Sequence, residues 1–130
     1  MKLAAVLAIM CGLCLAADTP ETVMVTYHVK SGAEAGLARA IEEHWATARK
    51  LKLVLEAPHM TLRGVEEDGR VYFVDIFTWR DAHIPDAAPE AIRAIWAEMN
   101  EAVEARGGKP GIAIQNVALV SWARQGAGGR

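Results

Sequence analysis

The segment Val71–Trp79, VYFVDIFTW, is apolar on both of its sides, and this feature constrains the fold more than any other in the chain. Its residues alternate as in a β-strand, with Tyr72 and Val74 on one side and Phe73 and Phe77 on the other. A strand with one solvated side would alternate apolar with polar residues. We therefore expect this strand to lie within a sheet that is covered on both faces.

Five further segments have the periodicity of a strand or of an amphipathic helix. Strands are expected at 22–30, 59–65 and 112–122, and helices at 31–50 and 90–106. In the first helix, Ser31 and Glu34 have the spacing of a capping box. The resulting order β-α-β-β-α-β predicts a ferredoxin-like α+β fold, in which a four-stranded antiparallel sheet carries both helices on one face.

The alternation of the strands also predicts which residues share a face. We assign to the helix side Met60 and Leu62 together with Tyr72, Val74 and Ile76. The other side then carries His59, Thr61, Arg63, Phe73, Asp75, Phe77, Trp79, Met24, Thr26 and His28. Three exposed aromatic side chains would form an unusually large apolar patch for a monomer, so we expect a second copy of the sheet to cover this side in a homodimer.

The amino terminus has the pattern of a cleavable export signal. Lys2 precedes an uncharged apolar run over 3–15, and small residues follow at Ala16 and Ala17. The run of 13 residues is too short to make a stable membrane anchor. We therefore expect a signal peptide at 1–16, a domain at 21–122, a loose tail at 123–130, and a periplasmic or secreted location.

Export would leave the mature chain without cysteine, because Cys11 and Cys14 both lie in the signal; lipidation of either one is the alternative. Without Lys2 the chain has 13 basic and 16 acidic residues, a formal net charge of −3. It has no basic block or stripe, which argues against nucleic acid as a partner.

Three stretches resemble the antibiotic-biosynthesis-monooxygenase family of dimeric α+β barrel proteins: VTYHVKSGAEAGLARAIEEHW, RVYFVDIFTWRDA and AIRAIWAEMNEAVEARGGKPGI. The resemblance implies two sheets packed face to face and a ligand pocket between each sheet and its helices. It also implies oxidation of a small phenolic substrate by oxygen without a cofactor. The haem-degrading relatives have a histidine on the second helix, whereas the segment 90–106 has none and Trp96 occupies the corresponding stretch.

The residues themselves suggest a base. Alternation places His28, His59 and Asp75 on one side of the sheet, where a carboxylate could raise the pKa of an imidazole and make it a catalytic base. The alternative is that each histidine is merely solvated at a strand end. No metal site is expected, because HxH and HExxH spacings are missing.

Other side chains are candidates for holding the substrate. Predicted substrate-binding residues are Arg63, Phe73, Phe77, Trp79 and Trp96. Arg63 could instead pair with Asp75, and Trp96 could be a core residue like Trp45. His44 and His83 are expected on the surface and in a loop. A non-catalytic protein that binds a small apolar ligand in the same pocket remains the alternative to an enzyme.

The signal predicts that the exported protein begins at or near Ala17. Intact mass spectrometry of exported material should give the mass of the chain without residues 1–16. Retention of those residues would contradict the prediction, and added acyl mass on Cys11 or Cys14 would identify a lipoprotein instead.

Overall fold

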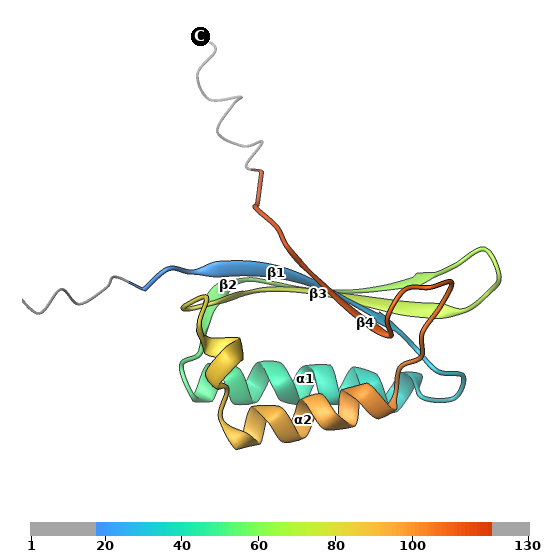
Figure 1. The fold of residues 1–130 in the computed structure, drawn as a ribbon, viewed down its shortest axis with the longest axis horizontal. Helices are drawn as coiled ribbons and strands as arrows, with labels where there is room; N and C mark the ends of the chain where they lie inside the picture. The colour runs from blue at the N-terminus through green and yellow to red at the C-terminus, as the bar shows by residue number, and fades with distance from the viewer. Residues whose placement is uncertain (1–17, 121–130) are drawn as a thin grey trace, which may run out of the picture.

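The computed structural model describes residues 18–120, so the predicted signal, both cysteines and the predicted tail lie outside the described residues. The elements in chain order are β1 (Glu21–His28), α1 (Glu34–Lys50), β2 (Val54–Val65), β3 (Val71–Trp79), the short 3₁₀ helix η1 (Ile84–Ala87), α2 (Glu90–Glu101) and β4 (Ile112–Asn116). Figure 1 shows one sheet with both helices on the same side of it. The predicted ferredoxin-like α+β fold is confirmed.

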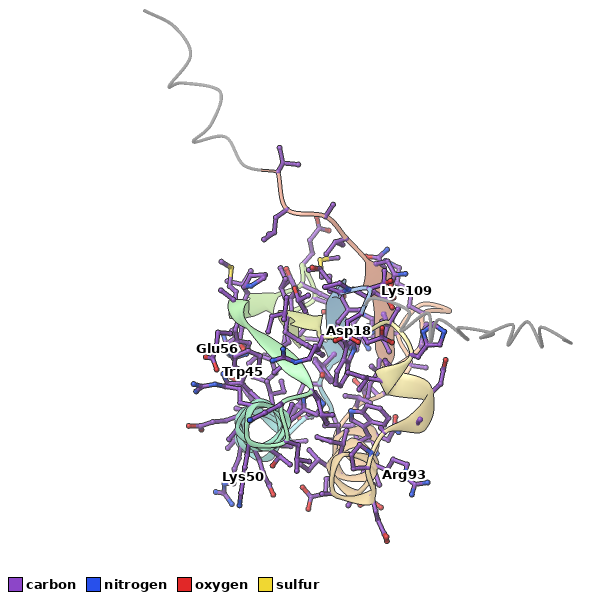
Figure 2. All side chains as sticks on the ribbon, turned by 90° about the vertical axis from the view of Figure 1, so that its left-hand side faces the viewer. Asp18, Trp45, Lys50, Glu56, Arg93 and Lys109 are labelled. Atoms are coloured by element: carbon purple, nitrogen blue, oxygen red, sulfur yellow. The ribbon has the colours of Figure 1, made fainter. Side chains whose placement is uncertain are left out.

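The four strands form one antiparallel sheet in the order β2-β3-β1-β4. β3 is therefore an inner strand, as its two apolar sides indicate, and β4 is a short edge strand. In the registers, Asp75 lies opposite Val25 of β1 and opposite Thr61 of β2. α1 and α2 pack side by side beneath the sheet, and Lys50 and Arg93 lie on the outer sides of these helices (Figure 2).

The predicted assignment of the two sheet faces is wrong. Phe73, Phe77 and Trp79 are buried on the helix side, whereas Met60 and Leu62 are 52% and 49% exposed on the other. The grouping of residues within β2 and β3 is correct, but the helices cover the opposite group. Phe73, Phe77 and Trp79 form the aromatic row of β3, which has a larger apolar area than Met60 and Leu62. Burying the aromatic row beneath the helices therefore gains more free energy than burying Met60 and Leu62.

The predicted grouping of β1 with β3 is also wrong. Opposite Phe73, Asp75 and Phe77 lie Tyr27, Val25 and Val23 of β1. Met24, Thr26 and His28 do lie on the side without helices, as predicted, but they share it with Met60 and Leu62 instead of with Phe73 and Asp75. Within residues 18–120, no helix is both long and apolar enough to cross a membrane.

The helix stripes fill the space between helices and sheet, as predicted. Leu37 of α1 and Ile92 of α2 are fully buried, and Met99 of α2 is nearly so. They pack in one core with the aromatic row of β3 and the helix-facing residues of β1.

Several element boundaries differ from the prediction. The N-cap of α1 is Ala33, with no side-chain capping bond, so Ser31 does not cap this helix. β2 begins at Val54 and passes through an irregularity before His59. After α2, Val103 forms an isolated bridge with Val29 in place of continued helix.

Candidate functional site

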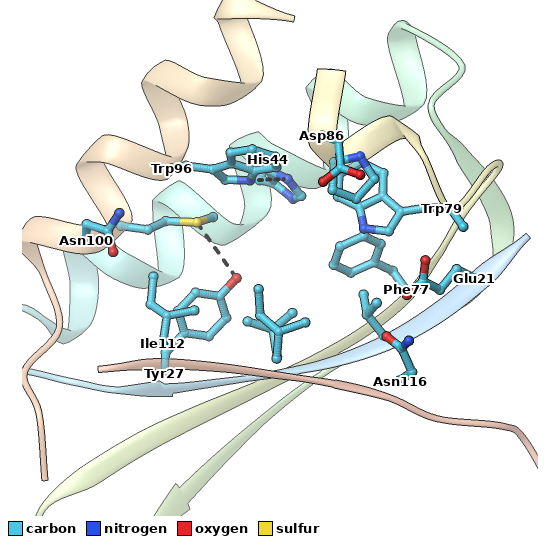
Figure 3. Close-up of a pocket in the computed structure, with 16 residues that line it drawn as sticks. Glu21, Tyr27, His44, Phe77, Trp79, Asp86, Trp96, Asn100, Ile112 and Asn116 are labelled. Carbon is cyan, nitrogen blue, oxygen red and sulfur yellow. Dashed lines mark hydrogen bonds between the residues drawn. The ribbon is translucent and has the colours of Figure 1, made fainter. Parts of the chain in front are cut away.

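The best-formed cavity lies between the sheet and α2 and has a volume of about 610 Å³. Its floor comes from β1, β3 and β4, and its other walls from α1, α2 and η1 (Figure 3). The lining residues are Glu21, Val23, Val25, Tyr27, His44, Phe77, Trp79, Ala82, Pro85, Asp86, Trp96, Met99, Asn100, Ile112, Ile114 and Asn116. A cavity of this size and apolar character accommodates a small organic molecule.

Aromatic rings make up much of the cavity wall. Phe77 and Trp79 meet edge to face with ring centroids 4.9 Å apart, and Trp79 meets Trp96 at 6.3 Å. Tyr27 lies on the floor, where its hydroxyl is 3.8 Å from the sulfur of Met99. Burial and the nearby Asp75 carboxylate raise the pKa of Tyr27, so its phenol stays protonated. The aromatic faces and edges suit a flat, unsaturated ligand.

His44 of α1 is the buried imidazole of this cavity. Its Nε2 lies 3.1 Å from the indole Nε1 of Trp96, which donates a hydrogen bond to it. Edges of Phe77 and Trp79 contact the imidazole ring at centroid distances of 5.5 and 5.8 Å. Burial, with a smaller contribution from His59, lowers the pKa of His44 to about 4. His44 is therefore neutral at physiological pH.

The prediction that His44 lies on the surface is wrong, although the sequence contains the signal. His44 follows Ile41 by three positions and Leu37 by seven, so it falls on the apolar stripe of α1. A titratable residue on such a stripe is either satisfied by a buried partner or part of a site. Here Trp96 supplies the partner.

Polar groups line the cavity at its rim. Glu21 comes from the start of β1, and Asp86 comes from η1. Asn100 of α2 and Asn116 of β4 add two amides (Figure 3). These four side chains could orient a polar substituent while the aromatic wall holds an apolar ring.

The predicted contact between His59 and Asp75 is present, but outside the cavity. His59 Nε2 lies 3.2 Å from Asp75 Oδ1, and the Thr61 hydroxyl donates a hydrogen bond of 2.8 Å to the same oxygen. The indole of Trp45 stacks on the His59 ring at a centroid distance of 3.8 Å. This pair therefore lies between α1 and the sheet, and neither residue lines the cavity.

Asp75 is only 1% exposed, and its Oδ2 has no hydrogen-bond partner among the described residues. Burial raises the pKa of the Asp75 carboxyl, while the hydrogen bonds from Thr61 and His59 act in the opposite direction. Arg63 does not neutralise it, because the Arg63 guanidinium pairs with Glu34.

His28 does not join His59 and Asp75, contrary to the prediction. It belongs to the sheet side without helices, where its Nδ1 donates a hydrogen bond of 2.9 Å to the carbonyl of Pro110.

Of the predicted substrate-binding residues, Phe77, Trp79 and Trp96 line the cavity, whereas Arg63 and Phe73 do not. Among residues 18–120, no group of three histidine, cysteine, aspartate or glutamate side chains is arranged to hold a metal ion.

The lowered pKa of His44 predicts a specific pH dependence of stability. Because folding favours the neutral imidazole, the free energy of unfolding should fall as the pH drops below about 6.5 and level off below about 4. The expected loss from this group is about 3 kcal/mol. Chemical denaturation of wild type and His44→Phe between pH 7 and pH 4 measures it.

The difference between the two proteins isolates His44, because both contain the same carboxyl groups, including Asp75. The wild type should lose more stability than His44→Phe over this range. Parallel curves for the two proteins would contradict the assignment of a buried neutral His44.

Comparison with solved structures gives several similar folds. An antibiotic biosynthesis monooxygenase has 18% sequence identity and a TM-score of 0.56 over 79% of this chain and 100% of that one. A variant of SnoaB, a cofactor-independent oxygenase from Streptomyces nogalater, has 14% identity and a TM-score of 0.58 over 78% of this chain and 94% of that one. A dimeric ferredoxin-like protein of unknown function from Jannaschia has 16% identity and a TM-score of 0.55 over 78% of this chain and 100% of that one.

No protein-family model matches the chain, and no curated protein matches its sequence. Because the sequence identities are only 14–18%, these comparisons establish a similarity of fold alone. The described domain thus has the ferredoxin-like α+β fold of the antibiotic biosynthesis monooxygenases.

Proposed function

We propose that the protein is exported, binds a small aromatic molecule of the phenol class in the cavity, and oxidises it with molecular oxygen without a cofactor. The observation that carries the proposal is the cavity of about 610 Å³, whose wall combines Phe77, Trp79 and Trp96. Two of the similar folds support the chemistry, since one is described as a cofactor-independent oxygenase and another as an antibiotic biosynthesis monooxygenase.

The proposed reaction needs a proton acceptor and a dry site. Loss of a proton converts an anthrone-type or phenol-type substrate into an electron-rich anion, which reduces oxygen directly. For an anthrone, the ring CH₂ group and O₂ become a ring carbonyl and water. The aromatic wall would keep bulk water from the intermediate.

Glu21 and Asp86 are the proposed proton acceptors, because their carboxylates line the cavity. His44 is unsuited to this role, since its Nε2 already accepts a hydrogen bond from Trp96. His59 and Asp75 lie outside the cavity, so we assign the proton transfer to the carboxylates at its rim.

A non-catalytic binding protein is the second candidate. It is favoured by the position of the two carboxylates at the rim, while the buried imidazole of His44 is neutral. Binding of an aromatic molecule needs only the shape and the dryness of the cavity. Turnover of oxygen distinguishes the two candidates.

Wild-type protein supplied with an anthrone or a hydroquinone should consume oxygen in an oxygen-electrode assay. Glu21→Gln combined with Asp86→Asn should lower the rate by about 10²-fold, the typical contribution of a general base. Glu90→Gln is the matched control, because this exposed carboxylate of α2 does not line the cavity. Binding of the anthrone by wild type without oxygen consumption would leave the binding protein as the function.

We further propose that the protein is a homodimer built on the sheet face that no described element covers. Met60 and Leu62 expose about half of their surfaces there, beside the partly buried Val74 and Ile76. Apolar side chains gathered on one face favour association with a second apolar surface. The similar Jannaschia protein is described as dimeric, which supports this proposal.

Light scattering should give twice the mass of the mature chain at micromolar concentration. Leu62→Asp should yield a monomer, because burying a carboxylate in the interface costs several kcal/mol. Arg39→Asp, on the exposed surface of α1, should remain a dimer. A stable monomeric wild type, or a dimeric Leu62→Asp protein, would contradict the interface.

A further inference from the structure

The hydrogen bond between Trp96 and His44 determines where the imidazole carries its proton. An indole N–H only donates, so the His44 Nε2 atom 3.1 Å away must accept with its lone pair. A neutral imidazole carries one proton, and because Nε2 accepts the bond from Trp96 this proton must be on Nδ1. Trp96 thus fixes one of the two tautomers of His44.

The second ring nitrogen of His44, Nδ1, is the one that Trp96 does not contact. It has no hydrogen-bond partner among the described residues, although His44 as a whole is only 3% exposed. In the described part of the chain, the side-chain atoms that are both fully buried and without a partner are Asp75 Oδ2 and Arg106 Nε. Nδ1 is not among them, and His44 is one of the residues that line the cavity.

The ring is also held in place from the sides. Phe77 and Trp79 meet it edge to face, and the Trp96 indole holds its Nε2. Hence the imidazole ring has a fixed position on the helix side of the cavity. A donor that is fixed before the ligand arrives gives orientation and specificity at little entropic cost.

We propose that the Nδ1–H group of His44 selects the ligand, by donating a hydrogen bond to a carbonyl or phenolate oxygen on an aromatic ring system. This inference rests on the proposed function of the cavity as an aromatic site. An aromatic hydrocarbon of the same shape would leave the N–H unpaired, which lowers affinity. The same donor would stabilise negative charge on a substrate oxygen as the proton leaves, in the manner of an oxyanion site.

Two unreactive probes of nearly identical shape test the inference. Fluorene and 9-fluorenone are tricyclic and differ by a carbonyl oxygen, which only accepts hydrogen bonds. Equilibrium dialysis of the wild type should show fluorenone bound about tenfold more tightly than fluorene, as expected for one hydrogen bond. In His44→Phe the two probes should bind with equal affinity, because the donor that distinguishes them is gone.

Trp96→Phe provides a second variant in which His44 stays. Without the indole donor, the proton can occupy either nitrogen, so the preference for fluorenone should decrease. Nitrogen-15 NMR of the His44 side chain reads the tautomer directly: the wild type should carry its proton on Nδ1, and Trp96→Phe should show a mixture. Thermal melting of each variant confirms that it is folded.

The binding results distinguish failure of the proposed aromatic site from failure of the proposed His44 donor. If neither probe binds the wild type, the aromatic site itself is refuted. If both bind equally, or if His44→Phe keeps the preference for fluorenone, the cavity stands and His44 is not the selecting donor. A wild-type His44 protonated on Nε2 would likewise overturn the inference.

Discussion

The rest of the structure depends on one packing interaction, the burial of Phe73, Phe77 and Trp79 of β3 beneath the helices. Phe77 and Trp79 face α1 and α2, and this choice brings Val25 and Tyr27 of β1 to the same side. The cavity exists because the aromatic row and the α2 stripe do not close the space towards β4. The same choice leaves Met60 and its neighbours on the uncovered face.

The element order, the bounds of β3 and the contact between His59 and Asp75 could be predicted from the sequence, because alternation determines which residues of paired strands share a side. Alternation does not determine which side receives the helices when both sides are apolar, as they are in β3. The site was harder to predict for a related reason. His44 is a polar residue on a helix stripe, and its role depends on Trp96, 52 residues further along the chain.

Asp75 and His44 are both buried titratable groups, and they differ in how their polar atoms are paired. Asp75 receives hydrogen bonds on one oxygen, while the other oxygen has no partner among the described residues. His44 accepts on one nitrogen and keeps a donor free on the other. In both cases burial disfavours the charged form. The two groups differ in their access to a ligand, because His44 lines the cavity and Asp75 does not.

β4, which supplies Ile112 and Ile114 to the cavity, is the five-residue edge strand of the sheet. It is hydrogen-bonded to β1 on one side only, so its local opening costs less free energy than opening of β3. One wall of the cavity therefore belongs to an edge strand that opens more easily than β3. A ligand seated against that wall would slow the hydrogen exchange of the β4 amides, and ordering of β4 would become part of the binding equilibrium.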